Sequence, residues 1–183
     1  MKLLCFTSLI IAISSCTSTK ELMDKNYLNG KVITEESKVT KERSTTLYPI
    51  TLDNINVLLG LSFDHTKNKR YLIIEVIGAH ILSKVTIRID EDVYVLNPNS
   101  TETVRTSGSM GSLNPSEYRN YSHQYYNIEK EILDDVAKAK SAYLRVDFLG
   151  SNKYVESKML EYKNTAPLKQ KIQEFQVKIS KTK

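Results

Sequence analysis

Hydrophobic and polar positions alternate most clearly in KVTIRIDEDVYVLNP, residues 84–98. Val85, Ile87 and Ile89 fall on one face of an extended segment, and polar residues fall on the other. The acidic turn Asp90–Asp92 is followed by a second alternating run that contains Val93 and Val95. A period of two is typical of a β-strand with one buried face. The segment therefore predicts a β-hairpin.

Longer apolar runs predict further strands. YLIIEVIGAHILS, residues 71–83, is almost continuously apolar and rich in β-branched residues, as in a strand buried on both faces. LYPITLDNINVLLGLSF, residues 47–63, contains shorter apolar runs. SAYLRVDFLG, the short turn SNK and KYVESKML predict a second pair of strands over residues 141–160. A short strand is also expected at residues 103–106.

Two segments, residues 127–140 and 165–180, have a helical period. Asn127 is expected to cap the first helix. Thr165 is expected to cap the second, with Pro167 in its first turn. The apolar stripes are Ile128, Ile132, Val136 and Ala139 in the first segment, and Leu168, Ile172, Phe175 and Ile179 in the second.

The order of these elements predicts an α+β fold. We expect a mainly antiparallel sheet, sandwich- or barrel-like, with one mid-chain helix and a C-terminal amphipathic helix packed on a sheet face. Ile87 and Phe148 are expected in one core. The order of short helix, AKAKSAYLRV, hairpin and terminal helix also resembles the tails of small uncharacterised bacterial exported proteins. That resemblance contains no diagnostic residue and implies nothing about function.

The first residues, MKLLCFTSLIIAISSC, follow a different pattern. Lys2 precedes an apolar run that has the length of a secretory signal, whereas a membrane-spanning helix needs about 20 apolar residues. The run ends in Ile13-Ser14-Ser15-Cys16, which resembles the lipobox of bacterial lipoproteins. The resemblance implies cleavage before Cys16 and attachment of lipid to its sulfur. Thr17 and Ser18 after the cysteine resemble an outer-membrane lipoprotein.

The resemblance divides the chain into three parts. We expect a signal peptide at residues 1–15, the lipidated cysteine and a flexible tether at 16–46, and a single globular domain at 47–183. The tether segment is rich in Ser, Thr, Lys and Glu, with one short strand expected near Lys31–Thr34. Such a segment buries too little apolar surface to offset its ordering entropy. The membrane would be a partner through the lipid on Cys16, and the domain would face the periplasm or the cell surface.

Composition excludes several kinds of chemistry. Cys5 would leave with the signal and Cys16 would carry lipid, so the mature chain has no cysteine for a disulfide, metal or nucleophile. The formal net charge is +5, with several lysines after Lys163. These lysines have no arginine or aromatic interleaving, so nucleic acid is not expected as a partner. The lysines either contact an anionic surface of the cell envelope or form the solvated face of an amphipathic helix.

Three further patterns lack the residues that catalysis or ion binding needs. His65, His80 and His123 stand in no zinc or hydrolase motif. SGSMGS, residues 107–112, lacks the ending of a phosphate-binding loop, and the acidic turn 90–92 lacks the EF-hand glycine and glutamate. We therefore expect a non-enzymatic protein with no catalytic residue, no metal and no cofactor.

EYRNYSHQYYN, residues 117–127, concentrates tyrosines in a chain that has no tryptophan. In an extended segment Arg119, Tyr121, His123 and Tyr125 share one face, and they are the candidate binding surface. Tyrosines with polar neighbours suit contact with sugars or with a protein partner. The alternative is that they pack a sheet edge with their hydroxyls in water.

Three functions stay open at this point. The first is a lipid-anchored, non-enzymatic binding or scaffolding domain, with an envelope protein or a cell-wall polymer as partner. The second is a small inhibitor or immunity-type protein against an envelope-acting enzyme, which a rigid protruding loop at Ser107–Leu113 would suit. The third is a hydrolase with an unrecognised site.

Overall fold

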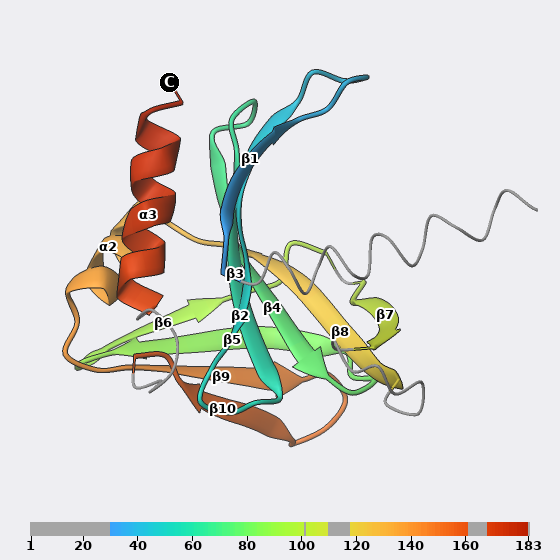
Figure 1. Cartoon of the computed structure of the whole chain (residues 1–183). Helices are drawn as coiled ribbons and strands as arrows, with labels where there is room; N and C mark the ends of the chain where they lie inside the picture. Colours follow the sequence, from blue (N-terminus) through green and yellow to red (C-terminus); the bar gives the residue numbers. More distant parts are fainter. Residues whose placement is uncertain (1–29, 101, 110–117, 161–167, 183) are drawn as a thin grey trace, which may run out of the picture.

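The computed structural model describes residues 30–100, 102–109, 118–160 and 168–182. These residues form two antiparallel sheets and two helices (Figure 1), which confirms the α+β class. The six-stranded sheet contains, in spatial order, β1 (Val32–Glu36), β2 (Arg43–Thr51), β3 (Val57–Asp64), β4 (Lys69–Ile77), β8 (Tyr118–Asn127) and β7 (Val104–Ser109). The four-stranded sheet contains β10 (Tyr154–Lys158), β9 (Ala142–Phe148), β5 (Leu82–Ile89) and β6 (Asp92–Leu96). The helices are α2 (Lys130–Lys138) and α3 (Leu168–Ser180). In the described part of the chain each sheet has two edge strands, so neither closes on itself.

The predicted hairpin is β5 and β6. Ile89 pairs with Asp92, which leaves Asp90 and Glu91 as a two-residue turn. Asp90 has a φ of 49°, the left-handed conformation that such tight hairpin turns use. Its carboxylate accepts hydrogen bonds from the backbone N–H of Lys140 and Ser141, at 3.1 and 2.8 Å, so this turn also holds the start of β9.

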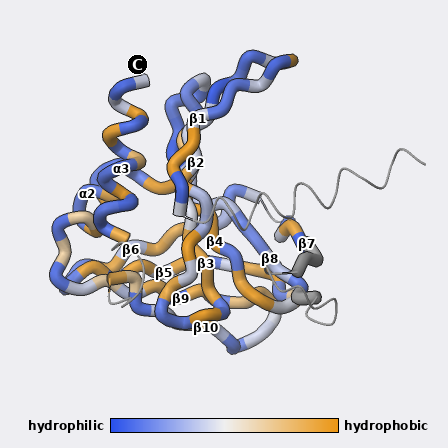
Figure 2. Tube along the Cα trace, in the orientation of Figure 1, coloured by the Kyte–Doolittle hydropathy of each residue, from blue (hydrophilic) through white to orange (hydrophobic). Residues whose placement is uncertain are grey.

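One hydrophobic core is shared by both sheets and both helices. Figure 2 shows apolar segments where the sheets meet. β4 lies between β3 and β8, and both Ile73 and Ile74 are buried although they point to opposite faces, as expected for this strand. Ile87 is fully buried, whereas Phe148 is half-buried and stacks on His80 with ring centroids 4.2 Å apart.

Both helices bury the stripes that the sequence predicts. The buried residues are Ile128, Ile132, Val136 and Ala139 beside α2, and Leu168, Ile172, Phe175 and Ile179 in α3. α3 contacts the start of the six-stranded sheet, because Lys178 Nζ donates to the Val32 carbonyl at 3.2 Å. It also contacts α2, because Gln176 Nε2 donates to Asp134 Oδ1 at 2.6 Å.

The folded part of the chain begins earlier than residue 47. β1 and β2 pair from Val32 with Leu47 to Glu36 with Arg43, so residues 32–46 are not a tether. Thr45 is fully buried, and its Oγ1 lies 2.9 Å from Thr34 Oγ1 and 2.8 Å from His65 Nε2. Hydroxyls that satisfy one another can occupy a sheet interior. The short strand expected near residues 31–34 is β1.

Two other expectations differ from the structure. Asn127 does not cap a helix, because it is the last residue of β8 and pairs with Tyr71, and α2 begins after Glu129. Ser107–Ser109 belong to strand β7 and not to a loop. Cys16, Thr165 and Pro167 lie outside the described residues, as does the rest of Ser107–Leu113.

Candidate functional site

An open cleft of about 880 Å³ lies on the six-stranded sheet, beside the hairpin of β1 and β2. Strands β1 to β4 and β8 contribute to it, together with the β1–β2 turn, the β3–β4 turn and the segment after β6. The described residues that line it are Glu35, Glu36, Ser37, Glu42, Arg43, Ser44, Ser62, Asp64, Lys67, Tyr71, Asn99, Ser100, Gln124 and Tyr125.

The floor of the cleft follows from strand alternation. In β3, Leu61 and Phe63 point into the core, so Ser62 and Asp64 point to the opposite face. Ser62 pairs with Tyr71 of β4, and Asp64 pairs with Ser44 of β2. Small serines beside a tyrosine leave open space above the sheet, and this space is the cleft.

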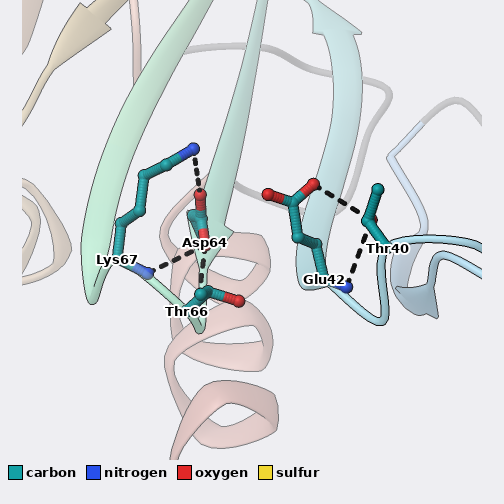
Figure 3. Close-up of polar contacts among 5 residues, drawn as sticks. All are labelled: Thr40, Glu42, Asp64, Thr66 and Lys67. Carbon is teal, nitrogen blue, oxygen red and sulfur yellow. Dashed lines mark hydrogen bonds and ion pairs between the residues drawn. The ribbon is translucent and has the colours of Figure 1, made fainter.

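The β3–β4 turn at the rim is held by Asp64 (Figure 3). The Asp64 carboxylate accepts hydrogen bonds from the backbone N–H of Thr66 at 2.9 Å and of Lys67 at 3.0 Å. Lys67 Nζ lies 3.1 Å from the same carboxylate. The charge of Lys67 is therefore already matched within the rim.

The β1–β2 turn forms the neighbouring rim (Figure 3). Thr40 Oγ1 donates to Glu42 Oε2 at 3.2 Å, and the Glu42 backbone N–H donates to Thr40 Oγ1 at 3.4 Å. Ser37 and Glu42 close the turn through a backbone bond of 2.8 Å. The two turns are thus each held by their own hydrogen bonds, with a carboxylate in each.

The remaining wall is the segment that leads from β6 toward β7. Gln124 is 3% exposed, and its Nε2 donates to the Ser100 and Glu102 carbonyls at 2.7 and 3.1 Å. The Asn99 backbone N–H donates to the Tyr125 carbonyl at 2.8 Å. Because a buried amide fixes this segment against β8, the wall of the cleft is preformed.

The cleft is negatively charged in a positively charged chain. Among the described residues, four carboxylates line it, against the two cations Arg43 and Lys67. Burial, the charge of Glu35 and a hydrogen bond with its carboxylate raise the pKa of Tyr48. Burial and the charge of Glu75 raise the pKa of Tyr125. The excess of carboxylates in the cleft would favour a cationic group of a ligand.

Of the predicted surface residues whose side chains the structure describes, Tyr121, His123 and Tyr125, only Tyr125 lines the cleft. Tyr125 is 40% exposed and lines it, whereas Tyr121 is buried. His123 is half-buried between them, with its ring 5.8 Å from that of Tyr125 in an edge-to-face arrangement. Arg119 belongs to β8 and pairs with Gly108, and its side chain lies outside the described part.

The tyrosine-rich segment is not a sheet edge, because β8 lies between β4 and β7. Its other face points into the core. Tyr126 is fully buried, its hydroxyl donates to the Ser83 carbonyl at 2.8 Å, and burial raises its pKa well above the usual value. Part of the tyrosine content therefore serves packing and not recognition.

The histidines have structural partners. His65 lies against Thr45 as described above, and burial, followed by the charge of Arg43, lowers its pKa. The backbone N–H of His80 donates to Ser122 Oγ at 2.8 Å. Within the described ranges, no group of three or more His, Cys, Asp or Glu side chains could hold a metal ion. The arrangement supports binding through charge and aromatic contact.

Sequence reasoning missed most of the cleft. Glu35, Glu36 and Glu42 lie in the segment that the sequence predicts to be a tether, and Asp64 and Lys67 belong to no motif. The β-branched residues of VITEE and RSTTLYPIT are a signal that could have predicted β1 and β2 as a pair of strands.

No protein family, no curated protein and no solved structure matches the chain. Among the helices of the described residues, none has the length and apolar character needed to cross a membrane.

Proposed function

We propose that this protein is a lipid-anchored, non-enzymatic binding domain of the bacterial cell envelope, held at the outer membrane through lipid on Cys16. The lipobox-like residues 13–16 support the anchor. The open cleft on the six-stranded sheet is the observation that carries the binding role. Its walls are preformed, so little ordering entropy opposes binding.

The cleft suits a basic segment of an envelope protein. Its carboxylates outnumber its cations, and Lys67 is already paired with Asp64. Tyr125 offers an exposed ring for the aliphatic part of a lysine or arginine side chain. A neutral glycan would gain from the ring but not from the excess of carboxylates.

The test is a titration of the full chain with a labelled peptide of alternating lysine and glycine. Glu36→Gln with Glu42→Gln removes two cleft charges while keeping an acceptor oxygen at each position. We expect about tenfold weaker binding, at roughly 0.7 kcal/mol per exposed charge pair, and a loss of affinity in high salt.

The matched control is Glu91→Gln with Glu131→Gln, which changes the net charge equally at exposed positions outside the cleft lining. This control should bind the peptide as the unmodified chain does. If both double variants bound the peptide equally weakly, the cleft would not be the site that binds it. Binding to purified cell wall, with no binding to the peptide, would indicate that the partner is a wall polymer and not a protein.

A second function, an inhibitor of an envelope-acting enzyme, is favoured by the hairpin of β1 and β2. This hairpin extends away from the rest of the chain (Figure 1). Its tip carries Val39, which is 90% exposed, and the tip is closed by backbone bonds between Ser37 and both Lys41 and Glu42. A stiff protrusion with an apolar tip is suited to enter the active site of another protein.

Purification of the chain from detergent-solubilised membranes separates the two functions. An inhibitor should retain a stoichiometric enzyme, and Val39→Asp should release it. The binding domain should instead lose its partner in the cleft double variant and keep it in Val39→Asp.

We also propose that the two sheets pack as a sandwich. The supporting observation is that Leu59 and Ile74 of one sheet and Ile87 and Val146 of the other belong to one core cluster.

A further inference from the structure

The outer face of the four-stranded sheet is a second polar surface, and it is rich in basic residues. Strand alternation turns Val85, Ile87 and Leu144 into the core, so that their neighbours Thr86, Arg88 and Tyr143 face outward. Cross-strand pairing places Arg88 between Val93 of β6 and Tyr143 of β9. The next row places Thr86 between Val95 and Arg145.

Cations predominate on this face. In the described strands β5, β9 and β10, the outward charges are the cations Lys84, Arg88, Arg145 and Lys158 and the two carboxylates Asp147 and Glu156. Asp147 is shared, because Arg145 Nε lies 2.9 Å and Lys84 Nζ lies 4.0 Å from its carboxylate.

Aromatic rings hold the two guanidinium groups on the sheet. Arg145 Cζ lies 3.8 Å from the ring centroid of Tyr154, and Arg88 Cζ lies 4.7 Å from that of Tyr143. Tyr154 is itself 49% exposed. The face therefore presents fixed cations together with accessible phenols.

The same face exposes apolar side chains. Val93 and Val95 of the edge strand β6 are 59% and 55% exposed. Beyond the end of β9, Leu149 is 61% exposed, and its backbone N–H donates to the carbonyl of the exposed Ile81. Cations, tyrosines and aliphatic side chains thus occupy one surface.

We propose that this outer face of the four-stranded sheet docks onto a bilayer that contains anionic lipids. Basic side chains near such a surface are attracted to its headgroups, and tyrosines concentrate at the depth where headgroups meet acyl chains. Exposed Val93 and Val95 would enter the boundary between them. An anionic wall polymer would account for the cations but leave the valines in water, which is why a lipid surface is favoured.

The inference does not rest on the proposed binding cleft, which lies on the other sheet. The two surfaces would allow the chain to lie on a membrane while the cleft stays open to a partner. The experiments below use substitutions that leave every cleft residue unchanged.

The first experiment reads the orientation with a single tryptophan, since the chain has none. The full chain with Cys16→Ala is mixed with vesicles of phosphatidylcholine and phosphatidylglycerol. Val95→Trp should shift its emission to shorter wavelength and be quenched by brominated lipid. Val39→Trp, at the exposed tip of the β1–β2 hairpin, should do neither.

The second experiment measures partitioning onto the same vesicles by sedimentation. Arg88→Gln with Arg145→Gln should weaken binding about 30-fold, since each basic residue near an anionic surface contributes about one kcal/mol. The control Lys38→Gln with Lys181→Gln makes the same charge change at exposed positions elsewhere and should have little effect. The N-terminal segment is identical in all variants, so its contribution to partitioning is the same in each and does not affect the difference between them.

A third variant, Val93→Ser with Val95→Ser, alters only exposed side chains and keeps the charge. It should weaken partitioning several-fold and separate a bilayer from a polymer, whose binding would be unchanged. Circular dichroism of each variant verifies that it is folded. The proposal is overturned if Val95→Trp stays in a water-like environment on anionic vesicles, or if both double charge variants lose binding equally.

Discussion

Phe175→Ala tests how α3 holds the fold together. Phe175 is fully buried between Ile172 and Ile179 on the apolar stripe of the helix. Removing a buried phenylalanine ring costs about 3–5 kcal/mol, because apolar surface is lost and a cavity remains. Typical domains have about 5–15 kcal/mol of total stability, so this one change should remove a large part of it.

The assay is thermal unfolding followed by circular dichroism. For a chain of this size each kcal/mol lowers the midpoint by about 2–4 °C, so a decrease of about 6–20 °C is expected. Val177→Ala is the control on the same helix, because Val177 is 50% exposed and its truncation should change stability by about 0.5 kcal/mol or less. A Phe175→Ala midpoint within a degree or two of the original would refute the packing of α3 on the sheet.

Three further changes probe other contacts. Asp53→Ala removes a carboxylate oxygen that accepts hydrogen bonds from Ser157 Oγ at 2.6 Å and from the Lys158 backbone N–H at 2.7 Å. The free energy of unfolding in denaturant should fall by about 1–3 kcal/mol, and an unchanged midpoint would contradict this role of Asp53. Backbone bonds from Ser141 and Lys140 lower the pKa of Asp90, so its stabilisation is present above the ordinary carboxyl pKa of 3.8 and is lost as the pH falls below it. The stability difference between the unmodified chain and Asp90→Asn should therefore shrink in acid, and a difference independent of pH would be evidence against this. Cys16→Ala should abolish labelling by a fatty-acid analogue, and equal labelling of both chains would exclude the lipid anchor.

The sequence predicts those elements whose burial follows a simple period. The β5–β6 hairpin is found because Val85, Ile87 and Ile89 are apolar and their neighbours are polar. A short strand was expected at β1, but its pairing with β2 was not, because the interior of this pair includes Thr34 and Thr45, which are polar side chains whose hydroxyls hydrogen-bond to each other. The predicted cap at Asn127 is wrong because strand pairing with Tyr71 extends through that residue.

The cleft is harder to predict than the strands that form it. Its carboxylates come from separate hairpins, and only strand register brings Asp64 opposite Ser44. Alternation correctly places Tyr125 on an accessible face, but the depth of Tyr121 depends on the flanking strands β4 and β7. Sequence alone gives the face of a residue on a strand and not what covers it.

Photo-cross-linking from Tyr71 in intact cells tests the binding role of the cleft most directly. A benzophenone side chain at this position replaces one aromatic ring of the cleft lining by another. We predict a discrete adduct with an envelope protein, joined at a segment rich in lysine and arginine, and loss of that adduct in the Glu36→Gln, Glu42→Gln chain. No adduct from Tyr71, or an adduct that persists without these two carboxylates, would contradict the account.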